Sequence, residues 1–444
     1  MMFKSLRVPT LGLVSVVAMA AASGQAAAQV SPTPQTFISV PPDTANVQPG
    51  QVFSSFDISY ADPVTGNIFI ADRSNASVDI FSGSTLTFLG RATGFTGQGA
   101  TTSVSGPDGV VTVTTGGVTT LYAGDGNSTL RIYNATSPSL ANPPTFVLNM
   151  PGAGNPISTG GTFRVDEMAY SPASHQVLAA NNADTPAFAT IFSTTNGAPP
   201  VSIQQGNITV PGQPSDGGME QPAWNPKTGT FFVSIPTLTS ASNDAGGLAE
   251  ISTAGQVLRT ISLASLGVSS CSPSGLAVNG AGNLMVGCGN APSTGAAAIL
   301  LNPTGGAAGT GSILKTVPGL ANTDELWFDP TTNKFYVTGN NGTNDSRFFD
   351  VVDANGNFVQ KVLLPTTTSA HSITVDPFNG NVFVALAGTA AVNPCPPGVT
   401  VGCIAVFSQA AAVPGPIAGA GLPGLILAAG GLVALARRRR QKIA

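Results

Sequence analysis

Charged residues are scarce in this sequence. Only 9% of its 444 residues are charged, whereas soluble domains average about 25%. So low a fraction is typical of disordered or membrane-embedded chains. However, the mean hydropathy is +0.24, and apolar residues are spread along the whole length, so most of the chain can form a core. Long uninterrupted apolar runs occur only at the two ends, which excludes a polytopic membrane protein.

Histidine and the common catalytic motifs are also scarce. The chain has two histidines, and it contains no H-E-x-x-H, G-x-S-x-G or Walker sequence. One G-x-G-x-x-G match, at 419–424, lies in an apolar tail with no strand before it, so it does not indicate a dinucleotide site. All 21 acidic residues fall between Asp43 and Asp376, and without the two ends the net charge is about −11. Nucleic acid is therefore not expected as a partner.

The N-terminus has the pattern of a secretory signal peptide, assigned to residues 1–28. Lys4 and Arg7 form a basic region, and Val8–Ala22 form an apolar run. Three alanines ending at Ala28 supply the small residues that signal peptidase requires. The alternative is an uncleaved N-terminal membrane anchor. Either reading predicts an exported body.

The C-terminus has three parts. A linker at 409–416 contains Val-Pro-Gly-Pro, an apolar segment follows at 417–436, and a basic cytoplasmic tail ends the chain at 437–444. Twenty helical residues span about 30 Å, one hydrocarbon core, so the segment is expected to be transmembrane. The basic cluster is expected to stay on the cytoplasmic side. The residues of this predicted sorting signal are Pro414, Pro416, Arg437, Arg438, Arg439 and Arg440.

This order of Pro motif, Gly-rich apolar segment and Arg cluster resembles the PEP-CTERM class of bacterial sorting signals. The resemblance implies processing by an exosortase-like membrane protease. It also implies a location in the cell envelope, either anchored in the inner membrane or released to the surface after cleavage. A plain C-terminal membrane anchor is the alternative.

Between the two ends, residues 29–408 contain a repeated unit. Each copy has an acidic or polar residue, a β-rich run, a Pro/Gly turn and a second apolar run, and the spacing averages about 52 residues. The copies start at Asp57, Asp108, Asp166, Glu220, Ser274, Asp324 and His371. Repeats of this length with four strands are typical of β-propeller blades. We therefore predict an all-β fold, a β-propeller of seven four-stranded blades, with six blades as the alternative.

The turn within each repeat has a defined chemistry. Asp or Asn initiates it, Pro sets φ at the second position, and Gly takes the left-handed position before the next strand. Asn333 and His175 replace this Gly in two copies, and both residue types tolerate positive φ. We therefore interpret His175 as an exposed turn residue without a catalytic role. In the first blade, strands are predicted at 68–71, 78–81 and 86–89.

The seventh repeat lacks a fourth strand. After 404–407 the chain enters the sorting signal, whereas 36–40 near the N-terminus is a spare β-rich segment. We predict that this segment completes the seventh blade and closes the ring, which removes an open sheet edge.

The four cysteines fit an oxidising compartment. Cys271 and Cys288 come out nearly opposite each other on adjacent strands, and Cys395 and Cys403 bracket a Pro-rich loop. We predict one disulfide within each pair. Metal ligation and free thiols are the alternatives.

The repeat starts form the candidate site. In a propeller the innermost strands begin at one end of a central channel, so the seven start residues are expected to form a ring around its mouth. Five carboxylates in one ring repel one another unless they bind a cation, share protons or face open water. Hard oxygen ligands favour Ca²⁺ or Mg²⁺. The alternative is a set of solvated residues that cap strand ends.

The repeats resemble NHL and YVTN-type propellers and, more distantly, six-bladed gluconolactonase-like hydrolases. The absence of identifiable His and Asn metal ligands, the long Ser/Thr/Gly-rich loops and the sorting tail favour a non-catalytic binding or scaffold module, displayed at the cell envelope, with a polysaccharide or protein ligand. The second resemblance implies a metal-dependent lactonase or esterase, in which Glu220, Asp324 and Asp57 would hold the metal. We expect the non-catalytic module, and the hydrolase is the alternative.

Overall fold

The computed structural model describes residues 29–43, 52–147, 154–289, 296–318, 323–340, 347–364, 371–389 and 391–409. Residues Val30–Gln409 form one compact unit. No helix in the described ranges is long and apolar enough to cross a membrane. The predicted signal peptide, linker motif, apolar segment and basic tail lie outside the described residues, so the structure does not test them.

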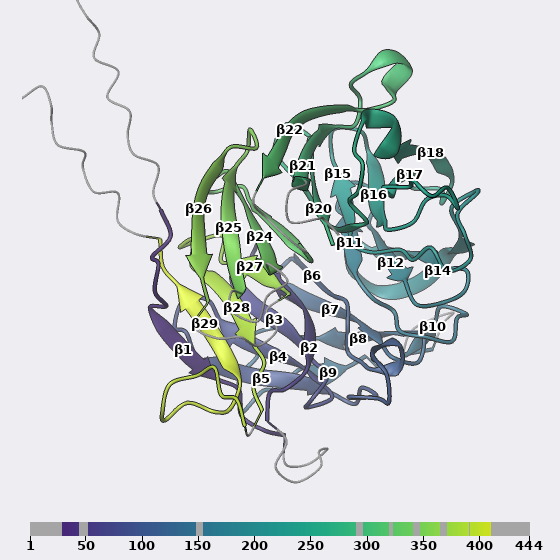
Figure 1. The fold of residues 1–444 in the computed structure, drawn as a ribbon. Helices are drawn as coiled ribbons and strands as arrows, with labels where there is room; N and C mark the ends of the chain where they lie inside the picture. The colour runs from purple at the N-terminus through teal and green to yellow at the C-terminus, as the bar shows by residue number, and fades with distance from the viewer. Residues whose placement is uncertain are drawn as a thin grey trace, which may run out of the picture. The chain divides into compact units, whose positions relative to one another are not determined.

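The described chain folds into seven antiparallel sheets arranged around a central axis (Figure 1). The first four blades consist of β2 (Phe56–Ala61), β3 (Asn67–Asp72), β4 (Ser77–Ser82) and β5 (Phe88–Thr93); β6 (Val110–Thr115), β7 (Val118–Asp125) and β8 (Thr129–Asn134), with β9 (Thr145–Phe146) and β10 (Ile157–Ser158) both paired to β8; β11 (Met168–Ser171), β12 (Gln176–Asn181), β13 (Phe188–Thr195) and β14 (Ala198–Ile208); and β15 (Pro222–Asn225), β16 (Thr230–Ile235), β17 (Gly247–Ile251) and β18 (Val257–Ser262).

The last three blades complete the circle. They consist of β19 (Pro273–Val278), β20 (Leu284–Cys288), β21 (Ala296–Asn302) and β22 (Ser312–Pro318); β23 (Leu326–Asp329), β24 (Lys334–Asn340), β25 (Arg347–Asp353) and β26 (Phe358–Leu363); and β27 (Ile373–Val375), β28 (Val382–Leu386), β29 (Cys403–Phe407) and β1 (Thr36–Ser39). The predicted all-β propeller of seven blades is confirmed: six blades have four strands, and the second has five because β9 and β10 both pair with β8.

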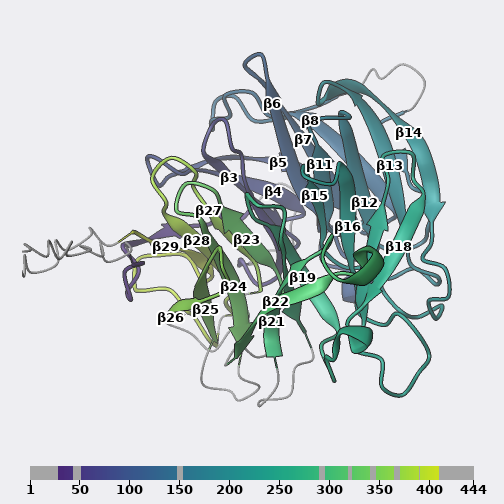
Figure 2. The same cartoon turned by 90° about the horizontal axis from the view of Figure 1, so that it is seen from above.

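The innermost strand of each blade contacts the innermost strands of both neighbours. The contacts run from β2 through β6, β11, β15, β19, β23 and β27 and return to β2. Figure 2 shows β6, β11 and β15 next to one another in the view from above. The second strands are buried over nearly their whole length, as in β3 and β16, because neighbouring blades cover both faces of each sheet. Large aromatic side chains such as Phe69, Phe231 and Tyr336 fill the space between blades.

The seventh blade is closed by the N-terminal strand, as predicted. β1 pairs antiparallel with β29, with Thr36 opposite Val406 and Ser39 opposite Cys403. Ile38 is 6% exposed and lies in the core between the seventh and first blades. The purple and yellow strands lie side by side in Figure 1. Two segments more than 360 residues apart therefore share one sheet.

The repeat turns have the predicted chemistry. The Asp62 carboxylate accepts hydrogen bonds from the amides of Val64 (2.7 Å) and Thr65 (3.1 Å), and Gly66 has φ +71°. His175 and Asn333 take the same left-handed position with φ of +56° and +55°. However, His175 is half-buried rather than exposed, because its Nδ1 atom lies 3.5 Å from the Tyr170 hydroxyl.

One predicted strand was placed wrongly. The fourth strand of the first blade runs over Phe88–Thr93 rather than 86–89, because the β4–β5 hairpin turn includes Leu86, which has φ +57°. Both predicted disulfides are present. Cys271 pairs with Cys288 at a Cα–Cα distance of 4.4 Å, and Cys395 pairs with Cys403 at 6.2 Å.

Candidate functional site

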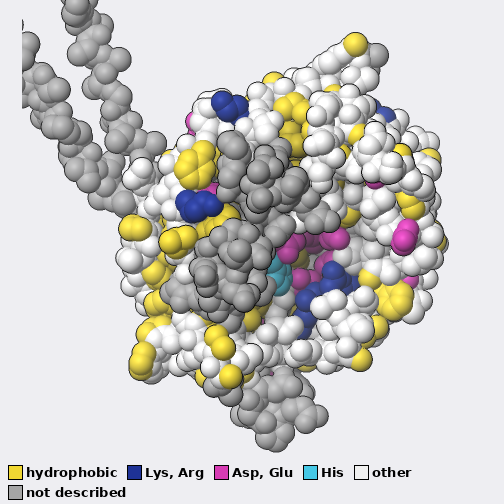
Figure 3. Space-filling model, in the orientation of Figure 1, with side chains coloured by type: hydrophobic (Ala, Val, Ile, Leu, Met, Phe, Trp, Pro, Cys, Tyr) yellow, Lys and Arg dark blue, Asp and Glu magenta, His cyan; other side chains and the backbone are white. Residues whose placement is uncertain are grey.

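The predicted ring residues all lie at the start of the innermost strands, at one end of the channel. Asp57 and Ser274 are the second residues of β2 and β19, and the other five lie two residues before their strands. In the space-filling view, acidic side chains gather with a histidine and basic side chains in a central hollow (Figure 3). Ser274 takes a structural role, since its hydroxyl donates to the Thr323 carbonyl at 2.6 Å.

Arg73, directly after β3, joins two members of the ring. Its Nη2 lies 2.5 Å from Asp57 Oδ2, and its Nε donates to Asp108 Oδ1 at 2.6 Å. All three side chains are nearly inaccessible to solvent. Arg164 makes a similar pair with Asp166 at 2.7 Å. These two guanidinium groups offset two of the three charges on the side of the ring that Asp57, Asp108 and Asp166 form.

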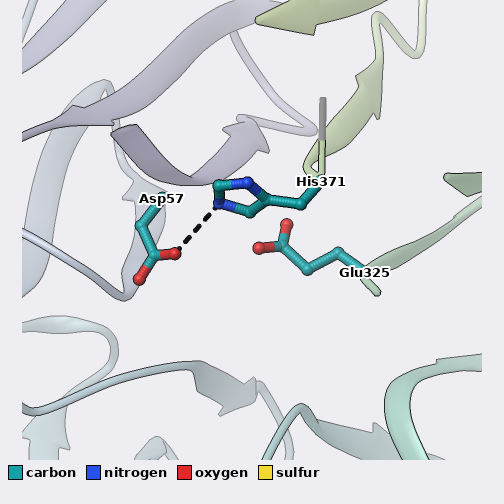
Figure 4. Close-up of side chains that lie close together, drawn as sticks. All are labelled: Asp57, Glu325 and His371. Carbon is teal, nitrogen blue, oxygen red and sulfur yellow. Dashed lines mark hydrogen bonds and ion pairs between the residues drawn. The ribbon is translucent and has the colours of Figure 1, made fainter. Parts of the chain in front are cut away.

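A second group of side chains lies on the other side of Asp57. His371 Nε2 is 3.2 Å from Asp57 Oδ1, and the His371 ring stacks on Phe56 with centroids 4.7 Å apart. The Glu325 carboxylate faces both side chains (Figure 4). Donor atoms of Asp57, Glu325 and His371 all lie within 4.8 Å of one another. The ring prediction did not include Glu325, which follows a predicted residue by one position.

The pKa values of this region are strongly perturbed. Burial would raise the pKa of Asp57, but the Arg73 charge and the hydrogen bond to His371 hold it far below its usual range. Burial opposes protonation of His371, whereas the hydrogen bond to Asp57 and the charge of Asp324 raise its pKa on balance. Burial and the surrounding charges raise the pKa of Glu220 to about 8.

Carboxyl groups outnumber cationic groups around the channel mouth. The carboxyl groups that act on one another here, which we call the acidic cluster, are Asp57, Asp108, Asp166, Glu167, Glu220, Asp324 and Glu325. Among the described residues, those opposing them are Arg73, Arg164 and, when protonated, His371. The excess negative charge must be relieved by protonation or by a bound cation.

Sequence reasoning missed four residues of this region. Arg73 lies in the turn after β3, and Arg164 lies in the segment that leads into β11, two residues before Asp166; neither position belongs to the repeat register. Glu167 and Glu325 each directly follow a ring residue, and this doublet was the available signal. Within a regular strand, two consecutive side chains point to opposite faces of the sheet. Glu167 and Glu325 lie just before their strands, so each can point toward the channel together with the ring residue that precedes it.

The comparisons with known proteins show the fold alone. No protein-family model and no curated protein sequence matches the chain. One similar solved structure is Chaetomium thermophilum Raptor, with 12% identity and a TM-score of 0.54; the match covers 87% of this chain and 29% of that one. Another is Kuenenia stuttgartiensis hydrazine synthase, with 12% identity and a TM-score of 0.52; the match covers 78% of this chain and 96% of that one. The Cps50 (Swd1) β-propeller domain of Myceliophteria thermophila is also similar, with 11% identity and a TM-score of 0.50; the match covers 82% of this chain and 98% of that one.

Proposed function

We propose that this protein is an exported, envelope-anchored or surface-displayed propeller that acts as a binding module and holds a divalent cation at its channel mouth. The observation that carries the proposal is the set of donor atoms from Asp57, Glu325 and His371 within 4.8 Å of one another. The excess of carboxylates around these atoms supplies the charge that a divalent ion needs. The two disulfides support the exported location.

The guanidinium pairs indicate which side of the ring is available. Arg73 already occupies the space between Asp57 and Asp108, so an ion there would meet a fixed positive charge. On the other side, Glu325 is 3% exposed, and burial together with the charge of Asp57 raises its pKa well above its usual range. A cation at the second group would allow Glu325 to ionise.

The donor set also indicates the kind of ion. Two carboxylates alone suit Ca²⁺ or Mg²⁺, whereas an imidazole nitrogen shifts the preference toward Zn²⁺ or Mn²⁺. His371 must be neutral to bind a metal, so metal affinity falls as the pH decreases through its raised pKa. We therefore place Zn²⁺ and Mn²⁺ ahead of Ca²⁺ and Mg²⁺.

The test is calorimetric titration of the dialysed protein with each of the four ions. We expect one ion per chain for wild type, and at least about tenfold weaker binding for His371→Asn and Glu325→Gln. His175→Asn is the matched control, because His175 is the other histidine of the chain and asparagine occupies the equivalent turn position at Asn333. Absence of binding heat for every ion at millimolar concentration, or equal affinity of all variants, would contradict the proposal.

The hydrolase alternative needs the same metal, so binding alone does not decide between the two functions. Hydrolysis of a chromogenic ester or a lactone by the metal-loaded protein would favour the enzyme if His371→Asn abolished it. A metal-loaded protein that is inactive toward both substrate classes would favour the binding module. Processing by an exosortase-like protease and a polysaccharide or protein ligand at the loops remain part of this proposal, and both are open to direct assay in cells.

A further inference from the structure

A cavity of about 540 Å³ occupies the channel next to the acidic cluster. Its wall comes from the innermost strands, and it starts one residue beyond the ring on three of them, at Glu167, Gln221 and Glu325. It continues to the exposed Val64, in the turn after β2, and to the exposed Asn196, in the turn between β13 and β14. The volume lies in the range of small-molecule sites, about 300–1,000 Å³.

The wall of this cavity is apolar and aromatic. It includes Tyr60, Tyr170, Trp224, Trp327 and Phe328, all of them half-buried. Tyr60 and Trp327 meet edge to face with centroids 5.4 Å apart, although they belong to the first and sixth blades. Such rings provide flat surfaces for an apolar or aromatic body, and their faces attract cations.

The polar residues of the cavity differ in how they are used. Gln221 Oε1 accepts hydrogen bonds from the amides of Leu276 (2.6 Å) and Leu326 (3.2 Å), so it connects inner strands. Glu167 is only 6% exposed, and no group in the described parts of the chain donates a hydrogen bond to its Oε2 atom. Burial and nearby carboxylates raise the pKa of Glu167 well above its usual range.

A buried carboxylate oxygen without a donor is costly unless a cation or a proton accompanies it. Arg73 and Arg164 are engaged by Asp57, Asp108 and Asp166. A hydrated metal ion fits poorly against an aromatic wall, whereas an organic ammonium group can donate to the carboxylate while its body contacts the rings.

We propose that this cavity binds a small organic ammonium compound, with its cationic group on Glu167 and its apolar body against Trp224 and Trp327. The proposal does not rest on the metal at the channel mouth, because Glu167 is not one of the residues proposed to hold that ion.

Tryptophan fluorescence gives a direct assay, since the chain has only two tryptophans and both line the cavity. The probes are 2-phenylethylammonium and its neutral counterpart 2-phenylethanol, titrated into full-length protein in buffer containing a chelator. Both should change the emission saturably. The amine should bind at least about tenfold more tightly, because it alone makes a charge-assisted hydrogen bond.

Variants separate this site from the channel mouth. Glu167→Gln keeps the shape of the side chain and should reduce the amine-to-alcohol preference to about one. His371→Asn, which is predicted to lose the metal, should keep amine binding.

Three results would overturn the proposal: equal affinity of the wild-type protein for amine and alcohol, an amine preference that survives in Glu167→Gln, or unchanged fluorescence with both probes at millimolar concentration. Each of these would leave the calorimetric metal titration unaffected, so failure here is distinguishable from failure of the proposed function.

Discussion

Removal of the Arg73 guanidinium tests how the structure tolerates its buried carboxylates. Arg73 is 5% exposed, and Asp108 is completely buried. Asp57 and Asp108 both bind this one cation. The Arg73→Met variant keeps much of the side-chain volume but leaves two carboxylates with no guanidinium between them. Breaking a buried ion pair in this way costs about 3–5 kcal/mol.

The pKa values predict when this cost is largest. Burial already raises the pKa of Asp108 well above its usual range even with Arg73 present. In Arg73→Met the pKa of Asp108 should rise further, so protonation of Asp108 at acidic pH can relieve the repulsion between the two carboxylates. The loss of unfolding free energy should therefore be greater at pH 8 than at pH 5.

The assay is urea denaturation in chelator with the disulfides intact. Adding Asp108→Asn to Arg73→Met should recover at least half of the loss, because it removes one uncompensated charge. Lys315→Met is the control for charge removal: Lys315 is exposed, and its loss should change stability by at most about 0.5 kcal/mol. If Arg73→Met costs less than about 1 kcal/mol, the value of an exposed pair, the reasoning is refuted.

Three further predictions concern the whole propeller. Because burial raises the pKa of Asp166 to about 6 and of Glu220 to about 8, the unfolded state releases these protons first, and the metal-free protein should lose stability as the pH rises from about 5 to 8. A thermal midpoint that increases over this range would contradict this. Deletion of residues 29–42 removes three buried aliphatic side chains, worth about 5 kcal/mol together, and opens the ring; an unchanged melting temperature would argue against the closure. Replacement of Cys271 and Cys288 by serine should lower the free energy of unfolding by about 3 kcal/mol, because the disulfide closes a loop of 17 residues in the unfolded chain. A stability equal to wild type would show that the bridge does not constrain the unfolded chain.

The architecture could be predicted because it is repeated. Each blade has the same order of strand, turn and strand, so one local pattern of Asp, Pro and Gly was confirmed several times over, as at Asp62 and Gly66. The closing strand was predictable for a related reason, since the seventh repeat lacks a fourth strand and the β-rich segment at 36–40 belongs to no repeat. The boundaries of single strands were predicted less accurately than the blades. Leu86 has a side chain typical of strands, but it lies in a hairpin turn at positive φ.

The acidic cluster could be predicted from the sequence only in part. The repeat register alone was enough to direct attention to Asp57, Asp166 and Asp324. It carried no information on Arg73 or Arg164, because the pairing of each with its carboxylate depends on how the inner ends of the blades pack around the channel. Nor could spacing indicate that Glu325 faces His371, because the two lie on neighbouring blades and their distance depends on how the inner strands pack around the channel.

The sequence by itself therefore determined the repeated blade and the scarcity of charge, because both follow from local chemistry along the chain. It also predicted seven blades and two disulfide pairs, with six blades and unpaired or metal-bound cysteines as the alternatives. Only the tertiary structure decided which of the carboxylates predicted at the channel mouth have a guanidinium partner and which do not, and that Glu167 and Glu325 join them. The physical reason is that electrostatic energy depends on distance and burial in three dimensions, and closure of the ring brings together residues that lie more than 300 positions apart, such as Asp57 and His371.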